Sequence, residues 1–160
     1  MRKTSKGFSL IELLIVVAII LIIAAIAIPN LLRSRIAANQ ASAVGSLRTL
    51  NTAEITYSST YNVGFTATMS YLAPPAAGGN PTSTAAGLID SVLAAGSKSG
   101  YNFSYTPGGA DSTGRINTYS YIAVPITSST GTNYYYTDQS GVIRQNSTTT
   151  AGSTDSPIAG

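Results

Sequence analysis

The sequence predicts an α+β fold, in which a long N-terminal α-helix packs against a small antiparallel sheet of three to four strands. Three observations predict it. Residues 8–32 of the 160-residue chain form an apolar run with a single charge. A helical period of apolar residues then continues to residue 61, and from residue 101 the period changes to two. The first half of the helix is apolar enough to be transmembrane, and the sheet belongs to a globular head.

Changes in composition divide the chain into five segments. Residues 1–7 are a short basic leader, and residues 8–32 are the transmembrane part of the helix. Residues 33–61 continue the helix in amphipathic form, and residues 62–146 form the head of loops and antiparallel strands. Residues 147–160 are rich in Ser and Thr and are expected to be a flexible tail.

The apolar run contains one acid that an ordinary spanning helix would not need. A helix of 25 residues is about 37 Å long, whereas the hydrocarbon core of a bilayer is about 30 Å thick. Glu12 is the only charge between Phe8 and Leu32. An ionised group in a spanning helix costs a few kcal/mol, so Glu12 is a functional candidate.

Two general interpretations of the N-terminus compete with a specific one. The first is a cleavable secretory signal with Ala25-Ile26-Ala27 as its cleavage site, although the apolar run exceeds the usual ~7–15 residues. The second is an uncleaved signal anchor with its basic end in the cytoplasm. Neither explains why Glu12 is present.

The specific interpretation comes from a motif at the junction of the leader and the apolar run. Residues 6–12 read Lys-Gly-Phe-Ser-Leu-Ile-Glu and are followed by Leu-Leu-Ile-Val-Val-Ala-Ile-Ile. This segment closely resembles the prepilin leader and processing site of type IV pilins and related pseudopilins. The resemblance covers roughly the first 35 residues. It implies that the long helix carries a small pilin-like head.

The resemblance also implies roles for individual residues. In this family a membrane enzyme, the prepilin peptidase/N-methyltransferase, cuts after the glycine, which is Gly7 here. It then methylates the amine of the new first residue, which is Phe8 here. Glu12 occupies the position of the family's signature acid, and Pro29 occupies that of its helix-kinking proline.

Elementary electrostatics explains why such an acid would set the register of a helical polymer. Cleavage leaves a cation at the Phe8 amine and an anion four residues later at Glu12. In a bundle of staggered copies, Glu12 of one copy can meet the Phe8 amine of its neighbour. A wrong axial offset would leave two buried, unpaired charges, which costs several kcal/mol.

The expected function is therefore that of a structural subunit of a type IV pilus. By the resemblance, its partners are further copies of itself in a helical homopolymer, the prepilin peptidase/N-methyltransferase, the pilus assembly platform and motor ATPases. Inner membrane lipid surrounds the helix before assembly. The single-pass precursor would lie in the bacterial inner membrane with its head in the periplasm, and the assembled filament would be extracellular.

Two alternative functions remain open on the sequence. One is a pseudopilin of a type II secretion system, which shares the same stalk. Its head would be distinguished by a calcium site of clustered acids, and Asp111-Ser112-Thr113-Gly114 is too short for a calcium loop. The other is a membrane-anchored binding module that never polymerises.

The second half of the helix is predicted from an amphipathic pattern beyond Pro29. Proline removes a backbone donor, so a bend or local melting is expected over residues 25–29; the alternative is that Pro29 ends the helix. Beyond Pro29, residues spaced three or four apart form one stripe along the helix: Ile36, Gln40, Ala43, Leu47, Leu50, Glu54, Tyr57 and Tyr61. Arg33, Arg35 and Arg48 lie off the stripe, where a solvated face competes with binding to anionic lipid or DNA.

The head is predicted as a loop, a helix and four strands. The loop covers residues 62–79, and the helix covers residues 84–95 and stops at Gly96. Strands are expected over residues 101–105, 118–125, 133–137 and 141–146, with a hairpin turn at residues 138–141. Pro125 should end its strand or mark a sheet edge. Seven of the ten tyrosines lie in residues 101–136, where rings are expected to pack and hydroxyls to reach water.

Composition excludes several kinds of chemistry. The chain has no Cys, His or Trp, so thiol and imidazole catalysis, disulfides and zinc fingers are excluded. The acids of the head stand singly, and no cofactor or metal motif is present, so the chain is not expected to be an enzyme. The three basic residues of the leader account for the whole net charge of +3, and nucleic acid is not indicated. Many pilins close the end of the head with a disulfide, which is impossible here.

Overall fold

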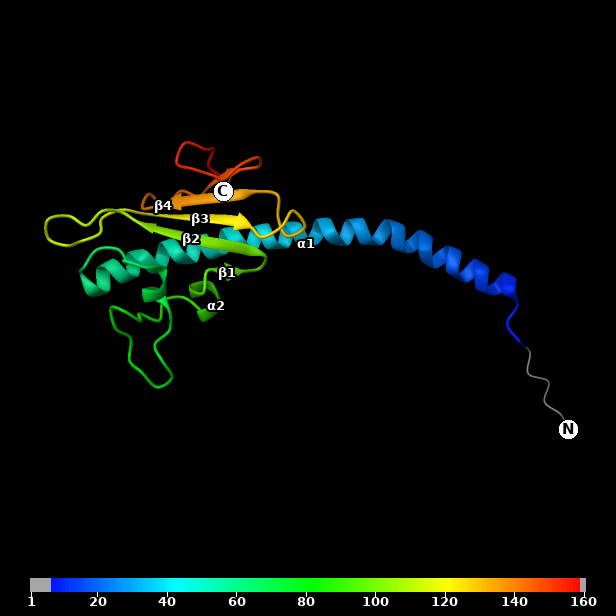
Figure 1. Cartoon of the computed structure of the whole chain (residues 1–160), viewed down its shortest axis with the longest axis horizontal. Helices are drawn as coiled ribbons and strands as arrows, with labels where there is room; N and C mark the ends of the chain where they lie inside the picture. Colours follow the sequence, from blue (N-terminus) through cyan, green and yellow to red (C-terminus); the bar gives the residue numbers. More distant parts are fainter. Residues whose placement is uncertain (1–6, 159–160) are drawn as a thin grey trace. The chain divides into compact units, whose positions relative to one another are not determined.

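The computed structural model describes residues 7–158 of the chain. The chain divides into two compact units, Met1–Arg35 and Ile36–Gly160. Helix α1, Leu10–Tyr61, contributes its first 26 residues to the first unit and the rest to the second. Figure 1 shows α1 as one uninterrupted coil.

The helix continues through its internal proline. Pro29 lies inside α1, and every residue from 25 to 29 is helical. The alternative in which Pro29 ends the helix is therefore wrong, and so is the local melting expected there. The pyrrolidine ring still removes the N–H that would bond to the carbonyl of Ala25, so a bend at this point stays a prediction.

The second unit contains one antiparallel sheet, which confirms the predicted fold class. Its strands follow one another in space as they do in sequence, so each pairs with its neighbours along the chain (Figure 1). The strands are β1 (Ser97–Lys98), β2 (Tyr101–Pro107), β3 (Tyr119–Pro125), β4 (Tyr134–Asp138) and β5 (Arg144–Asn146). The sheet thus has five strands instead of three or four. The extra strand, β1, has only two residues, too few to show a period.

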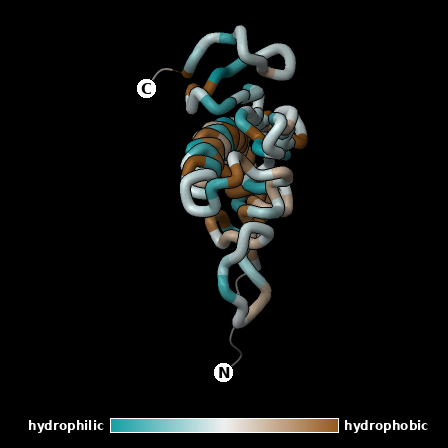
Figure 2. The backbone as a smooth tube through the Cα atoms, turned by 90° about the vertical axis from the view of Figure 1, so that its left-hand side faces the viewer, coloured by the Kyte–Doolittle hydropathy of each residue, from teal (hydrophilic) through white to brown (hydrophobic). Residues whose placement is uncertain are grey.

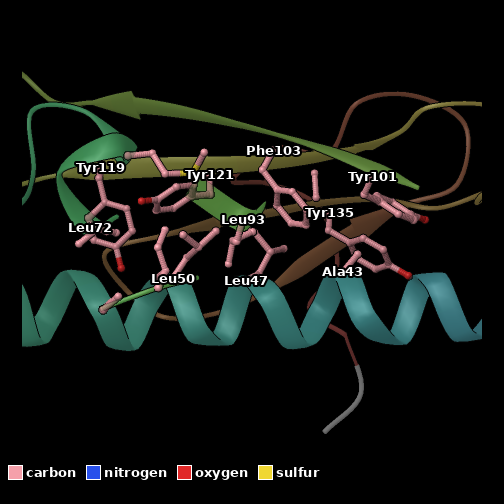
Figure 3. Close-up of a cluster of buried hydrophobic side chains, with 14 of the residues drawn as sticks. Ala43, Leu47, Leu50, Leu72, Leu93, Tyr101, Phe103, Tyr119, Tyr121 and Tyr135 are labelled. Carbon is pink, nitrogen blue, oxygen red and sulfur yellow. The ribbon is translucent and has the colours of Figure 1, made fainter. Parts of the chain in front are cut away.

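The period-two pattern places alternate side chains of the strands against α1. The predicted helix stripe is confirmed, because Ala43, Leu47 and Leu50 are buried on the face that meets the sheet (Figure 3). From the sheet, aromatic side chains fill the opposite side of the same core: Tyr101, Phe103, Tyr119, Tyr121 and Tyr135. Figure 2 shows that the loops outside this core are mostly neutral or polar.

Two turn predictions are confirmed at the ends of strands. The turn between β4 and β5 is closed by a hydrogen bond from the Gly141 N–H to the Asp138 carbonyl (2.9 Å), and Gly141 has a positive φ of 74°. This conformation strongly favours glycine. Pro125 is the last residue of β3. Because β3 is the central strand, Pro125 ends the strand and does not mark an edge.

The helix expected over residues 84–95 is much shorter than predicted. Only α2, Ser91–Ala94, is helical, and the Asp90 side chain caps it by accepting a hydrogen bond from the Leu93 N–H. The preceding backbone donors are used elsewhere: the N–H groups of residues 86–89 bond to carbonyls in or next to the short 3₁₀ helix η1, Met69–Leu72. Such long-range bonds compete with helix formation.

The C-terminal segment is folded over described residues 147–158 and not loose as expected. The Asp155 carboxylate accepts hydrogen bonds from Asn146 Nδ2 (3.0 Å) and the Gly152 N–H (2.8 Å). The Ile158 N–H bonds to the Ile143 carbonyl at 2.9 Å, and Ala151 is buried. Backbone pairing and one acid therefore hold the end of the head in a chain that cannot form a disulfide.

Candidate functional site

The first turn of α1 holds the acid that the sequence singles out. Ser9 precedes the helix, and the Glu12 carboxylate accepts a hydrogen bond from the Ser9 N–H at 2.9 Å. The pair has the spacing of a capping box, in which an acid in the first turn satisfies a backbone donor that has no helical partner. The carboxylate also complements the positive end of the helix dipole. In this monomer, Glu12 is thus satisfied by its own chain.

The predicted processing site lies just outside the helix. Gly7, Phe8 and Ser9 have no regular secondary structure, and all three residues are exposed. The Phe8 side chain is 83% exposed. Because the residues on both sides of it are exposed, the bond between Gly7 and Phe8 is sterically accessible. A peptidase must bind its substrate backbone in an open conformation, and this segment offers one. Phe8 precedes Glu12 by four residues in the sequence.

The first unit presents a long apolar surface. Sixteen large hydrophobic side chains between Leu10 and Leu32 are exposed, most of them by more than half. By length and composition, α1 is the one helix in the described part of the chain that could cross a membrane. Exposed apolar area of this extent is unfavourable in water, at about 25 cal/mol per Å². Another apolar phase must therefore cover these side chains.

A second carboxylate on α1, Glu54, lies in the core of the head. It is fully buried and accepts three hydrogen bonds: from the Thr66 N–H (3.0 Å), from Thr66 Oγ1 (2.7 Å) and from Tyr121 Oη (2.7 Å). Burial, the largest effect, raises the pKa of Glu54, and the hydrogen bonds from Thr66 and Tyr121 oppose it. No cation pairs with this carboxylate among the described residues.

Sequence reasoning missed this buried network. In the sequence, Glu54 is one of two polar residues, with Gln40, that interrupt the stripe of residues 36–61. That interruption was the available signal, because an acid on a buried face needs donors. Those donors come from residues 12 and 67 positions away, which the sequence alone does not connect.

The tyrosine hydroxyls differ from expectation. Their rings pack in the sheet as predicted, but several hydroxyls form hydrogen bonds inside the protein instead of reaching water. Tyr119 donates to Asn51 Oδ1 (3.0 Å), and Tyr105 donates to the Thr66 carbonyl (2.6 Å). Burial strongly raises the pKa of Tyr121, so this phenol remains a donor at any physiological pH. These tyrosines serve the core, and their buried faces are not available to stack with bases.

In the loop at residues 111–117 of the head, the Asp111 carboxylate is bonded by donors of the same loop. One carboxylate oxygen of Asp111 accepts bonds from Thr113 and from the Arg115 N–H, and the other accepts one from Asn117. These bonds, led by that of the Thr113 hydroxyl, lower the pKa of Asp111. Among the described residues, no group of three or more His, Cys, Asp or Glu could hold a metal ion.

Comparisons with known proteins match only part of the chain. The family model "Prokaryotic N-terminal methylation motif" matches residues 2–28. The chain is 65% identical over 37 residues to the type IV wide pilus major component PilA4 of Thermus thermophilus, covering 23% of this chain and 28% of that protein. It is 52% identical over 50 residues to the type IV major pilin protein PilA of Myxococcus xanthus, covering 31% and 23%. The matches thus span about a quarter of these relatives. No solved structure matches the chain.

Proposed function

We propose that this chain, whose N-terminal segment is that of a type IV pilin, is the precursor of a structural subunit of a type IV pilus. The observation that carries the proposal is the uncovered apolar surface of α1. The first turn of this helix holds Glu12, and the predicted cleavage site lies just before the helix. Lipid covers this surface in the membrane-anchored precursor, and other copies of the same surface cover it in the extracellular filament. The enzymes and motors of assembly are further proposed partners.

Processing changes the charge at the start of α1. Cleavage after Gly7 removes Arg2, Lys3 and Lys6 and leaves a methylated, positively charged amine on Phe8. In the precursor the Glu12 carboxylate caps its own helix through the Ser9 N–H. In the filament it would also meet the Phe8 amine of a neighbouring copy. This pair fixes the axial offset between copies, because any other offset buries both charges unpaired.

Substitutions at Glu12 separate capping from charge. Glu12→Gln keeps a side-chain oxygen for the Ser9 N–H but has no negative charge, whereas Glu12→Ala has neither. Both variants should be processed and membrane-bound, and both should form at least about tenfold fewer filaments, because the neighbouring amine is left unpaired. Electron microscopy of surface filaments and immunoblots of the membrane fraction measure the two effects. Normal filaments from Glu12→Gln would refute the proposed register.

Mass spectrometry of the mature protein tests the processing step. The expected N-terminus is N-methylated Phe8. A chain that still carries residues 1–7, or one that starts after Ala27, would contradict the proposal. The first result would indicate a signal anchor, and the second would indicate a cleaved secretory signal.

A further inference from the structure

The two arginines that follow the apolar run have no counter-ion in the described chain. Arg33 and Arg35 are both exposed. The sequence has no acid between Glu12 and Glu54, so neither arginine has an acidic residue three or four positions away on α1. The one ion pair among the described residues joins Lys98 to Asp90. The hydroxyl of Ser34, between the arginines, bonds back to the Asn30 carbonyl.

The length of the uncharged run matches the thickness of a bilayer core. Residues 13–32 contain no charge, and 20 helical residues rise by about 30 Å, which equals the thickness of the hydrocarbon region. If this run fills the hydrocarbon, Glu12 lies at one boundary and Arg33 at the other. Both arginines then lie within about 5 Å of the end of the run along the helix axis.

Helix geometry directs these side chains back towards the bilayer. In an α-helix, every Cα–Cβ bond tilts towards the N-terminus, and long side chains lie over the preceding turn. At the C-terminal end of the run, this direction leads from the aqueous side towards the headgroups. Successive residues rotate by about 100°, so Arg33 and Arg35 point to nearly opposite sides of α1 and contact different lipids.

We propose that Arg33 and Arg35 bind the phosphates of phospholipid headgroups on the head side of the membrane and fix the depth of the subunit before assembly. The inference rests on the membrane insertion in the proposed function. A guanidinium matches two oxygens of a phosphate with parallel hydrogen bonds. Anionic phospholipids are preferred, because each arginine near a membrane surface adds a favourable interaction with negative lipid charge. Extraction into a filament must break these contacts.

Arg48 provides a matched control on the same helix. It is also exposed, but it lies 15 residues beyond Arg33, which corresponds to about 22 Å of helix rise. That distance exceeds a Debye length at physiological ionic strength, about 8 Å, so Arg48 should not sense the headgroups. Arg48→Gln removes the same charge as Arg33→Gln without the proposed contact.

The test measures which lipids surround residue 34 in the full-length chain. Because the chain contains no cysteine, Ser34→Cys carries a single fluorophore between the arginines. The labelled protein is reconstituted at low density into phosphatidylcholine vesicles that contain a small fraction of nitroxide-labelled phosphatidylglycerol. A parallel sample contains phosphatidylcholine with the same nitroxide. The ratio of the two quenching efficiencies reports local enrichment of the anionic lipid.

The proposal predicts enrichment of about fivefold per arginine at physiological ionic strength, where Arg48 is screened from the headgroups. The combined Arg33→Gln and Arg35→Gln variant should lose this enrichment, and Arg48→Gln should retain it. Equal quenching by both lipids in the parent, or undiminished enrichment in the double variant, would overturn the inference. So would a change in fluorescence on adding duplex DNA that requires both arginines, because it would assign them to nucleic acid. Flotation of the labelled chain with the vesicles tests insertion separately: a chain that fails to float contradicts both this inference and the proposed function.

Discussion

Two glutamates on one helix occupy opposite environments, and each environment sets what the carboxylate can do. Glu12 is exposed in the monomer and bonds only to the nearby Ser9 N–H, so another molecule can approach it. Glu54 is enclosed by Thr66 and Tyr121, which use both of its oxygens. The first carboxylate is suited to an intermolecular contact, and the second ties the helix to the sheet.

The raised pKa of Glu54 predicts an unusual pH dependence of head stability. Because the folded state binds the Glu54 proton more tightly than the unfolded state, protonation favours folding. The contribution is complete below the ordinary pKa of glutamate, about 4.5, and is lost as the pH rises through the raised folded value. Denaturant unfolding of the full chain in detergent at a series of pH values should therefore give a free energy of unfolding that falls over this range.

Controls for this effect come from the chain itself. Glu54→Gln cannot titrate and should remove the fall above pH 4.5. Asp90 and Asp111 have lowered pKa values, so their contributions have the opposite sign and disappear below the ordinary aspartate value of 3.8. A pH profile of Glu54→Gln that matches the parent would show that this carboxyl is not the source.

Local pattern predicted four of the five strands, β2 to β5, and the start of α1, where neighbouring residues decide the structure. The alternation of Tyr101, Phe103 and Tyr105 with polar residues specifies β2 without reference to the rest of the chain. The helix predicted over residues 84–95, before β2, is mostly absent for the opposite reason. The N–H groups of Ala86 and Leu88 bond to Tyr71 and Leu72, which the sequence does not place nearby. Pattern therefore succeeds where bonding is local or periodic.

The C-terminal segment shows the same limit at the scale of an element. Its Ser, Thr and Gly residues have the composition of a loose end, yet Asp155 is bonded to Asn146 and Gly152. The Arg144 side chain also donates to the Asp155 carbonyl at 2.9 Å. Asp155 therefore connects the segment to β5 through its carboxylate and its backbone carbonyl, and the Gln145 N–H adds a bond to the Ser156 carbonyl. Composition alone does not reveal these connections.

Asp155→Ala should release the segment. The loss of two hydrogen bonds to a carboxylate should lower the free energy of unfolding by about 1–3 kcal/mol. Hydrogen exchange of the Ile158 N–H, which bonds to the Ile143 carbonyl, should accelerate markedly. Asp111→Ala is the matched control, because Asp111 also organises a loop but has no bond to the segment. Unchanged exchange at Ile158 in Asp155→Ala would show that backbone pairing alone holds the end.

At the scale of the whole molecule, the two units differ in how their apolar side chains are covered. All fully buried side chains of the described chain lie at or beyond Ala43, so the core belongs entirely to the second unit. The first unit buries none of its large apolar side chains. Under the proposed function, a membrane or other copies supply the apolar surroundings of the first unit, whereas the second contains its own core.

This division predicts that residues 36–160 fold without the apolar helix segment. The fragment keeps the buried stripe of α1, the sheet and the Glu54 network, so it should be soluble without detergent, monomeric and cooperative in unfolding. Size-exclusion chromatography, circular dichroism and denaturant unfolding measure these properties.

Leu50→Ala in the same fragment should lower the free energy of unfolding by about 2–5 kcal/mol, because Leu50 is fully buried between α1 and the sheet. Ile55→Ala, at a position that is 60% exposed on the same helix, should cost far less. Aggregation of the fragment, or equal losses from the two substitutions, would mean that the head depends on the first unit for its core.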